Sequence, residues 1–164
     1  MLRRAADWLV PAENPSGVVY GVMVIGALLA AESGRHETHL DTLLSAAVAA
    51  ALYWLAHAYA SVLGERLGSA EPLTAGVLLR ALGHDWALIR GASIPLLALV
   101  IAWASGAAQE TAVNAALWSA VAGLVVFELL AGIRSRATPG ELVLEVAVGM
   151  TMGTGIIVLK IVLH

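Results

Sequence analysis

Five long apolar runs, separated by short polar connections, are the feature that most restricts how this chain can fold. The runs cover residues 16–32, 40–63, 91–108, 111–133 and 140–163. Each is close to the roughly 20 residues that a helix needs to cross the hydrocarbon of a bilayer. Helices are expected because a segment surrounded by lipid must satisfy its backbone hydrogen bonds internally. The chain is therefore predicted to be an all-α, polytopic integral membrane helix bundle, with one transmembrane domain over 1–164.

The composition supports this prediction and excludes several classes of protein. Of the 164 residues, 60% are hydrophobic and 13% are charged, whereas soluble proteins carry about a quarter charged residues. There is no cysteine, so disulfides, thiolate metal sites and cysteine nucleophiles are excluded. A net charge of -3 gives no basic surface for nucleic acid. Phosphate-loop, serine-hydrolase and dinucleotide motifs are absent from the sequence, so an enzyme is not favoured.

The segment 72–90, between the second and third runs, is predicted to be an amphipathic helix lying at the membrane interface. Arg80, His84 and Arg90 fall broadly on one side of it and could meet a lipid headgroup. A break near Gly91 is expected before the third span begins. The alternative is one long helix that continues into the third span and is kinked at Pro95, since proline is tolerated within membrane helices.

The distribution of cations predicts the orientation, because cytoplasmic connections carry an excess of Lys and Arg. With the N-terminus in the cytoplasm and the C-terminus outside, the outer side carries Arg35 and Lys160. The remaining cations then fall on the cytoplasmic side: Arg3, Arg4, Arg66, Arg80, Arg90, Arg134 and Arg136. The sequence therefore predicts a multi-pass protein of the inner or plasma membrane, with the lipid bilayer as its first partner.

Three ionisable side chains fall inside the predicted spans: His57, Glu128 and Glu145. At 1.5 Å per residue, all of them lie roughly 6 to 10 Å inside the cytoplasmic boundary. His57 belongs to a small and polar helix face that includes Tyr53 one turn away. Charged groups within a membrane need partners. If the three helix faces converge, an imidazole lies between two carboxylates, with a tyrosine beside it.

Two interpretations of this cluster stand side by side. In the first, His57 is a protonation switch, Glu128 and Glu145 are its carboxylate partners and Tyr53 is a hydrogen-bonding neighbour. The protein is then a small channel or transporter for protons, cations or small solutes. In the second, the same side chains only fix helix packing, and the protein is a non-catalytic membrane partner or assembly subunit. Glu141 is expected to favour the N-terminal end of the fifth helix, where negative charge suits the helix dipole.

The connection "ESGRHETHLD" gathers His36, His39 and Asp41, a set that could form a loose divalent-metal site. Its "HETH" is one residue shorter than the H-E-x-x-H of metalloproteases, so that enzyme class is not supported. A plainer interpretation is that Thr38 and Asp41 form a capping box at the start of the second span. No other cofactor is predicted.

Small residues recur at four-residue spacing in the first run, at Gly17 and Gly21, and in the fifth, at Gly149 and Gly153. Such spacing lets helices approach closely in lipid. Packing within one chain and packing in a homo-oligomer both satisfy the pattern, and a transport role would require an oligomer to enclose a path. No repeated motif is evident, which argues against an inverted-repeat carrier.

Overall fold

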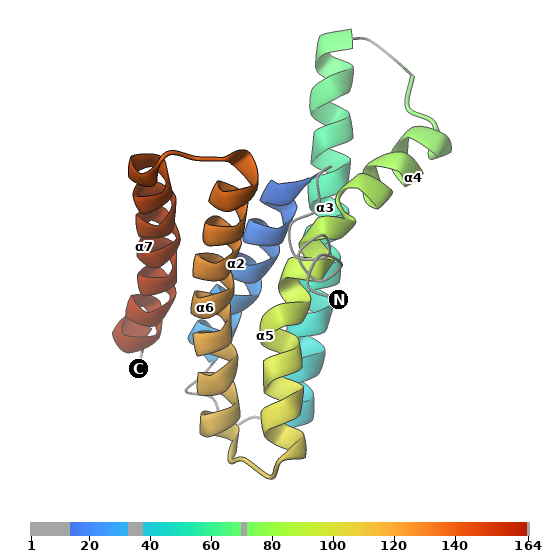
Figure 1. The fold of residues 1–164 in the computed structure, drawn as a ribbon. Helices are drawn as coiled ribbons and strands as arrows, with labels where there is room; N and C mark the ends of the chain where they lie inside the picture. The colour runs from blue at the N-terminus through green and yellow to red at the C-terminus, as the bar shows by residue number, and fades with distance from the viewer. Residues whose placement is uncertain (1–13, 33–37, 70–71, 164) are drawn as a thin grey trace.

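The computed structural model describes residues 14–32, 38–69 and 72–163, and this part of the chain is all-helical without strands. Five helices are long and apolar enough to span a membrane when Ala75–Ala104 is counted as one. The predicted all-α chain with five long apolar helices is confirmed. The helices are α2 Pro15–Glu32, α3 His39–Ser69, α4 Ala75–His84, α5 Trp86–Ala104, α6 Gln109–Ser135 and α7 Pro139–Leu163 (Figure 1).

Capping residues fix where several of these helices begin. The predicted capping box is confirmed, since the Thr38 hydroxyl donates to Asp41 Oδ2 over 2.7 Å and the Asp41 N–H donates back to Thr38 Oγ1. Thr138 and Glu141 make the same reciprocal pair at the start of α7, with a hydroxyl-to-carboxylate distance of 2.8 Å. Glu141 is therefore a capping residue, as expected. Such boxes satisfy N–H groups that have no partner inside the helix.

The break between α4 and α5 lies at Asp85, not near Gly91 as the sequence led us to expect. Gly91 is buried within α5, and a Cβ atom there would overlap the backbone of Val18 in α2. The glycine thus serves close helix packing rather than a chain break. Pro95 also lies inside α5 and is buried. Its missing N–H removes one backbone hydrogen bond without ending the helix.

Successive long helices run in opposite directions, so the ends of the helices gather in two layers. In Figure 1, α2, α5 and α7 run downwards and α3 and α6 run upwards. We call the upper layer the arginine-rich end, because it holds Arg66, Arg80, Arg134 and Arg136, and the lower layer the Lys160 end. At the arginine-rich end, α3 extends past the other helices and α4 leans against this extension.

The centre of the bundle is the crossing of α2 and α5, which run in the same direction. A Cβ atom on Gly21 would overlap the Leu88 carbonyl, and a Cβ atom on Gly91 would overlap the Val18 carbonyl. Gly21 and Gly91 lie 70 positions apart in the sequence, and so do Val18 and Leu88. Each helix therefore presents the same positions to the other. An approximate two-fold axis along the bundle produces this reciprocal contact.

The same 70-position register continues from α2–α3 to α5–α6. The packing agrees with it, because α3 packs on α5 as α6 packs on α2. Buried residues pair across the two halves as Leu29 with Leu99, Thr42 with Ala112, Ala46 with Ala116 and Ala50 with Ala120. The structure thus contains two related hairpins, although no repeated motif in the sequence predicted them. The hairpins keep their pattern of small and buried positions but share few identical residues.

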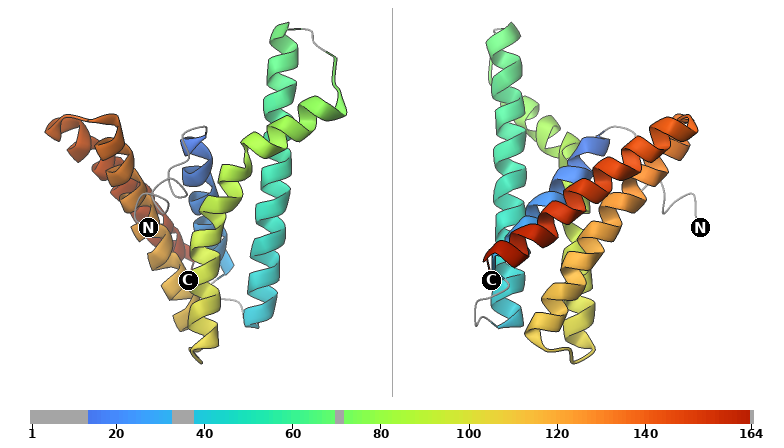
Figure 2. Two further views of the ribbon diagram at one scale, coloured as in Figure 1. Left: turned by 45° about the vertical axis from the view of Figure 1, so that its right-hand side comes forward. Right: turned by 90° about the vertical axis from the view of Figure 1, so that its left-hand side faces the viewer.

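Each hairpin is covered by a different helix. The 25-residue helix α7, which comes after α6, packs along α6 and α2. The 10-residue helix α4, which comes after α3, covers one end of α3 and then leads into α5. Figure 2 shows α3 at one side of the molecule and α6–α7 at the other, with α2 and α5 between them. The α6–α7 side is therefore covered over a much greater length than the α3 side.

Candidate functional site

The carboxylates of Glu128 and Glu145 lie at the interface of α6 and α7, each over a glycine of the opposite helix. A Cβ atom on Gly149 of α7 would lie 2.9 Å from Cγ of Glu128. A Cβ atom on Gly132 of α6 would overlap Oε2 of Glu145. The glycines thus provide the space that the two acidic side chains occupy. Of the three ionisable groups that the sequence places at one level, the structure thus brings Glu128 and Glu145 together.

The two acids have little to compensate their charge. They are close enough for electrostatic repulsion between them, and Oε2 of Glu145 is buried with no hydrogen-bond partner in the described part of the chain. Repulsion between carboxylates is strong where water is excluded. Chemically, such a pair can hold one proton, or one cation, between its oxygens.

His57 has aromatic neighbours. Its ring centroid lies 5.8 Å from that of Tyr20 in α2 and 6.0 Å from that of Tyr53, one turn earlier in α3. The predicted neighbour Tyr53 is present, and Tyr20 was missed because it is the isolated polar ring in its apolar run. The described residues show no hydrogen bond from His57 to Glu128 or Glu145. A relay through all three side chains stays a prediction.

A separate polar contact joins the start of α2 to the break between α4 and α5. The amide of Asn14 donates to Oδ1 of Asp85 over 2.9 Å and to the His84 carbonyl over 3.3 Å. Oδ1 of Asn14 accepts the Gly17 N–H over 2.9 Å, so the same side chain caps α2. Asp85 is 4% exposed, and its Oδ2 has no hydrogen-bond partner among the described residues. The sequence signal for this contact was the acid Asp85 within the segment predicted to be an amphipathic helix.

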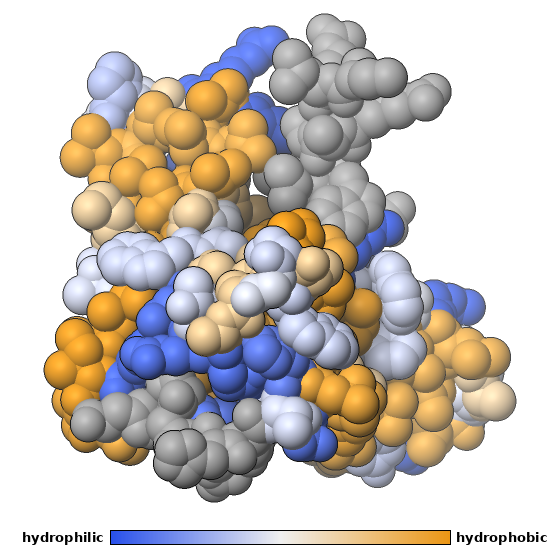
Figure 3. All heavy atoms as spheres, turned by 90° about the horizontal axis from the view of Figure 1, so that it is seen from below, coloured by the Kyte–Doolittle hydropathy of each residue, from blue (hydrophilic) through white to orange (hydrophobic). Residues whose placement is uncertain are grey.

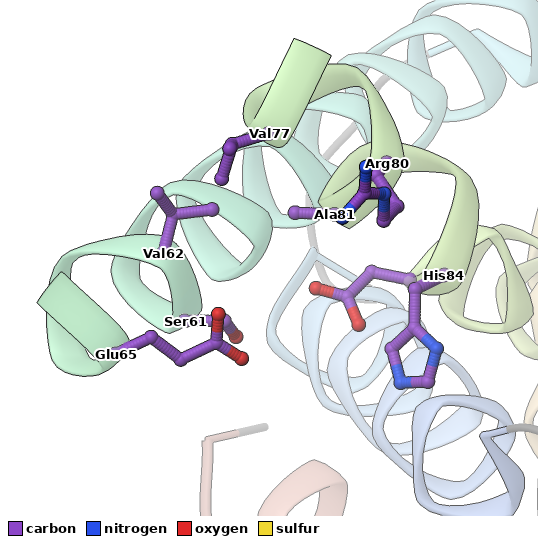
Figure 4. A pocket seen from close by; sticks show the side chains of 8 residues that line it. Ser61, Val62, Glu65, Val77, Arg80, Ala81 and His84 are labelled. Atoms are coloured by element: carbon purple, nitrogen blue, oxygen red, sulfur yellow. The ribbon is translucent and has the colours of Figure 1, made fainter. Parts of the chain in front are cut away.

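Next to this contact, a pocket of about 250 Å³ opens between α3 and α4. Glu65 reaches from α3, and Arg80 and His84 reach from α4, so charges of both signs face one space (Figure 4). Two of the three cations predicted to meet a lipid headgroup therefore lie together, while Arg90 lies in α5 and does not line this pocket. The lining residues are Ser61, Val62, Glu65, Val77, Arg80, Ala81, His84 and Asp85.

Polar side chains also tie the helices together at the Lys160 end. Gln109 donates to the hydroxyl of the buried Thr42 over 2.6 Å, which joins α6 to α3. The Ser45 hydroxyl donates to Glu32 over 3.0 Å, which joins α3 to α2. Lys160 of α7 donates to Asn114 of α6. Figure 3 shows this end, with hydrophilic residues gathered between hydrophobic ones.

Two of the three residues proposed as metal ligands have other contacts. His39 Nε2 lies 3.1 Å from the Ala107 carbonyl, and its ring stacks on Trp103 at 5.6 Å. Asp41 is held in the capping box. His36 lies outside the described residues. In the ranges that are described, no group of three or more metal-ligating side chains occurs.

Comparison of the chain with protein-family models, with curated proteins and with solved structures gives no match. Function must therefore be inferred from the side chains and their geometry.

Proposed function

We propose that this protein passes protons or small monovalent cations across the inner or plasma membrane, with Glu128 and Glu145 as the pair that binds them. The observation that carries the proposal is the placement of two carboxylates against each other between α6 and α7, where one buried oxygen has no donor among the residues that the structure describes. Ionisable groups within spans are costly and tend to mark ion or proton pathways. Here repulsion adds to the cost of burying each group, because the two groups have the same charge.

The alternative role of these acids is to hold helices together, and their chemistry argues against it. A hydrogen bond between helices needs a donor, whereas two ionised carboxylates offer only acceptors. Such a contact becomes favourable when a proton or a cation lies between the oxygens. Gly132 and Gly149 leave room for both acids, because a Cβ atom at either position would crowd an acidic side chain of the opposite helix. This supports a binding role for the pair.

We place the arginine-rich end in the cytoplasm, following the excess of arginines on that side. Glu128 and Glu145 are then nearer the cytoplasmic face, and the polar contacts of the Lys160 end are nearer the outer face. The pair of Lys160 and Asn114 lies on the same two helices as the acids. A proton or cation moving along the α6–α7 interface would pass both. His57 is kept in this proposal as a second protonatable group.

Flux into vesicles tests the proposal. The full chain is reconstituted in proteoliposomes that enclose a pH-sensitive dye, and an imposed potential drives protons or, in a parallel assay, sodium or potassium. Flux above that of empty vesicles is expected for the unaltered protein. Glu128→Gln and Glu145→Gln should each reduce it to the empty-vesicle level, because an amide cannot exchange the proton or balance the cation.

Glu141→Gln is the matched control. Glu141 lies on the same helix and is exposed, and glutamine can also complete a capping box. This variant should keep full flux. His57→Ala measures whether the imidazole belongs to the path. The proposal fails if the unaltered protein carries no flux, or if Glu128→Gln and Glu145→Gln both conduct normally.

A second candidate function, as a membrane partner or assembly subunit, is favoured by a different observation. An apolar groove of about 370 Å³ lies open between α3 and α5. A groove of this kind suits another helix, because small residues allow helices to approach closely in lipid.

A further inference from the structure

The groove between α3 and α5 has a filled counterpart in the same molecule. Its lining residues are Ala47, Ala50, Ala51, Trp54, Trp86, Ile89, Ala92, Ser93 and Leu96. By the 70-position register, Ala50, Ala51, Trp54 and Leu96 correspond to Ala120, Val121, Leu124 and Gly26. Those four residues lie where α7 packs on α6 and α2. The filled position therefore indicates the kind of segment that the open groove accepts.

The contacts of α7 define that position closely. A Cβ atom on Gly153 would lie 2.7 Å from Cγ1 of Val121, and one on Gly149 would lie 3.3 Å from the Leu124 carbonyl. A Cβ atom on Gly26 would meet both Ile156, at 2.8 Å, and Ala120, at 3.3 Å. An apolar helix with small residues at its contact face thus fills the groove between α6 and α2. In the first hairpin, α4 covers only the arginine-rich end of the equivalent position.

The open groove is shaped for the same kind of helix. Ala47 and Ala51 are exposed and Ala50 is buried below them. Because these side chains are only methyl groups, another helix can come close to the α3 backbone along this part of the groove. Trp54 and Trp86 meet edge to face at 5.4 Å at the end nearer α4, and the Trp54 indole donates to the Leu82 carbonyl. These rings bound the groove where α4 ends. Small residues allow the close backbone approach on which helix association in lipid depends.

Helix α7 itself offers a second small face. Ala147, Thr151 and Gly155 recur at four-residue spacing and are all exposed. A Cβ atom on Gly155 would meet nothing within 4 Å, unlike one on Gly149 or Gly153. The Thr151 hydroxyl donates to the Ala147 carbonyl over 2.8 Å, so its polar group needs no outside partner. One face of α7 is therefore used within the chain and the opposite face is free to pack elsewhere.

We propose that α7 of a second copy of this chain docks in the groove between α3 and α5, through Ala147, Thr151 and Gly155. The docked helix runs in the same direction as α7 does in its own chain, as the filled counterpart requires. All copies then share one orientation in the membrane. Because the contact joins different surfaces of the two copies, it is heterologous, and it forms a ring when successive rotations about an axis along the membrane normal return to the first copy.

Cross-linking between two introduced thiols tests this contact, and the absence of cysteine from the sequence makes each thiol unique. Ala51→Cys and Thr151→Cys chains carry different tags, are reconstituted together in lipid vesicles and are mildly oxidised. The expected product joins the two tags. Trp118→Cys on the exposed face of α6 replaces Thr151→Cys in the control and should give little product.

Two results would overturn the proposal. A product that joins Ala51→Cys to Ala51→Cys alone would mean that grooves face each other. A yield no greater than that of the Trp118→Cys control, falling with lipid dilution, would mean that lipid fills the groove.

A larger side chain placed in the groove provides a second test, in which association between copies is measured. Ala51→Leu should weaken association between donor- and acceptor-labelled copies by on the order of tenfold, since overpacking a close contact is unfavourable. Ala60→Leu makes the same change at an exposed position of α3 outside the groove and should leave association unchanged. Equal association in both variants would contradict docking in the groove. Both experiments are independent of ion flux, so they can fail while the proposed transport holds, or the reverse.

Discussion

Gly21 of α2 and Gly91 of α5 occupy equivalent positions on two crossing helices, and each removes the side chain that would keep the other helix away. The overlap that a Cβ atom would cause is with backbone atoms in both cases. Backbone cannot turn aside as a flexible side chain can. The central crossing is therefore the part of the fold least tolerant of added volume.

Gly21→Ala is expected to destabilise the protein by roughly 1–3 kcal/mol or more, because the two helices must separate to admit the methyl group. Gly64→Ala is the matched control, since a Cβ atom there meets nothing within 4 Å. That change should be neutral or stabilising by up to about 1 kcal/mol through helix propensity. Unfolding of the purified protein in mixed detergent micelles measures both. Equal stability of the two variants would show that the crossing can loosen to admit a methyl group.

The contact between Asn14 and Asp85 leads to a second prediction. Asn14→Ala removes both the cap of α2 and the hydrogen bond to a buried carboxylate, so a loss of roughly 1–3 kcal/mol is expected. Asp85→Asn keeps an acceptor for the Asn14 amide and removes an unpaired buried charge, so it should cost less. The same detergent unfolding assay compares them. A larger loss for Asp85→Asn would indicate that the charge of Asp85 has a partner of its own.

The unfolding free energy of a Glu145 variant distinguishes a pair of acids that binds an ion from a pair that only holds helices together. Glu145→Gln removes the repulsion with Glu128 and adds a hydrogen-bond donor. Its unfolding free energy is therefore expected to stay within about 1 kcal/mol of the original or to rise. Flux should be lost nevertheless. If stability falls together with flux, the acids serve packing, and the loss of flux is explained by loss of the folded protein.

The cap of α4 gives a local prediction. The Thr74 hydroxyl accepts the Val77 N–H over 3.3 Å at the start of this short helix. Thr74→Ala should increase amide hydrogen exchange over 75–84 while exchange in α5 stays unchanged, because short helices depend on their ends. Thr111→Ala, at an exposed position early in α6, should leave α4 unchanged. Exchange that rises equally in α4 and α5 would mean that the two helices unfold together despite the break at Asp85.

The orientation can be determined with single thiols on exposed serines. Ser135→Cys lies at the arginine-rich end and Ser105→Cys at the Lys160 end. In intact cells, a membrane-impermeant thiol reagent should label Ser105→Cys directly and Ser135→Cys only after the membrane is permeabilised. This expectation rests on the cytoplasmic excess of arginine. The reverse labelling pattern would invert the proposed topology.

Local sequence signals predicted the helices and caps well, because these depend on neighbouring residues. Long apolar runs indicated the helices, Thr38 with Asp41 three positions later indicated the cap of α3, and Glu141 was expected at the start of α7. The predicted break near Gly91 was too late in the chain, since a glycine can serve close packing between helices as well as end a helix. Only the contact with Val18 distinguishes the two roles of Gly91.

Contacts between distant segments were harder to predict. Depth along each helix correctly put Glu128 and Glu145 at one level, but depth does not say which helices are neighbours. Because α2 and α5 lie between α3 and the α6–α7 pair, the ring that His57 contacts across the helices is Tyr20 of α2. The register of the two hairpins was also hidden, because Gly21 and Gly91 are among the few identities that the pairs retain. It becomes visible once the contacts of both glycines are known.

The extension of α3 has a practical consequence for imaging. With 31 residues and a rise of 1.5 Å per residue, this helix is roughly 46 Å long, and the hydrocarbon layer is only about 30 Å thick. If a detergent micelle covers the length that α3 shares with the other long helices, the rest of α3, with α4 beside it, projects from the micelle. Small helical particles inside micelles have few features by which electron micrographs can be aligned. This projecting pair of helices would give each particle image a recognisable direction.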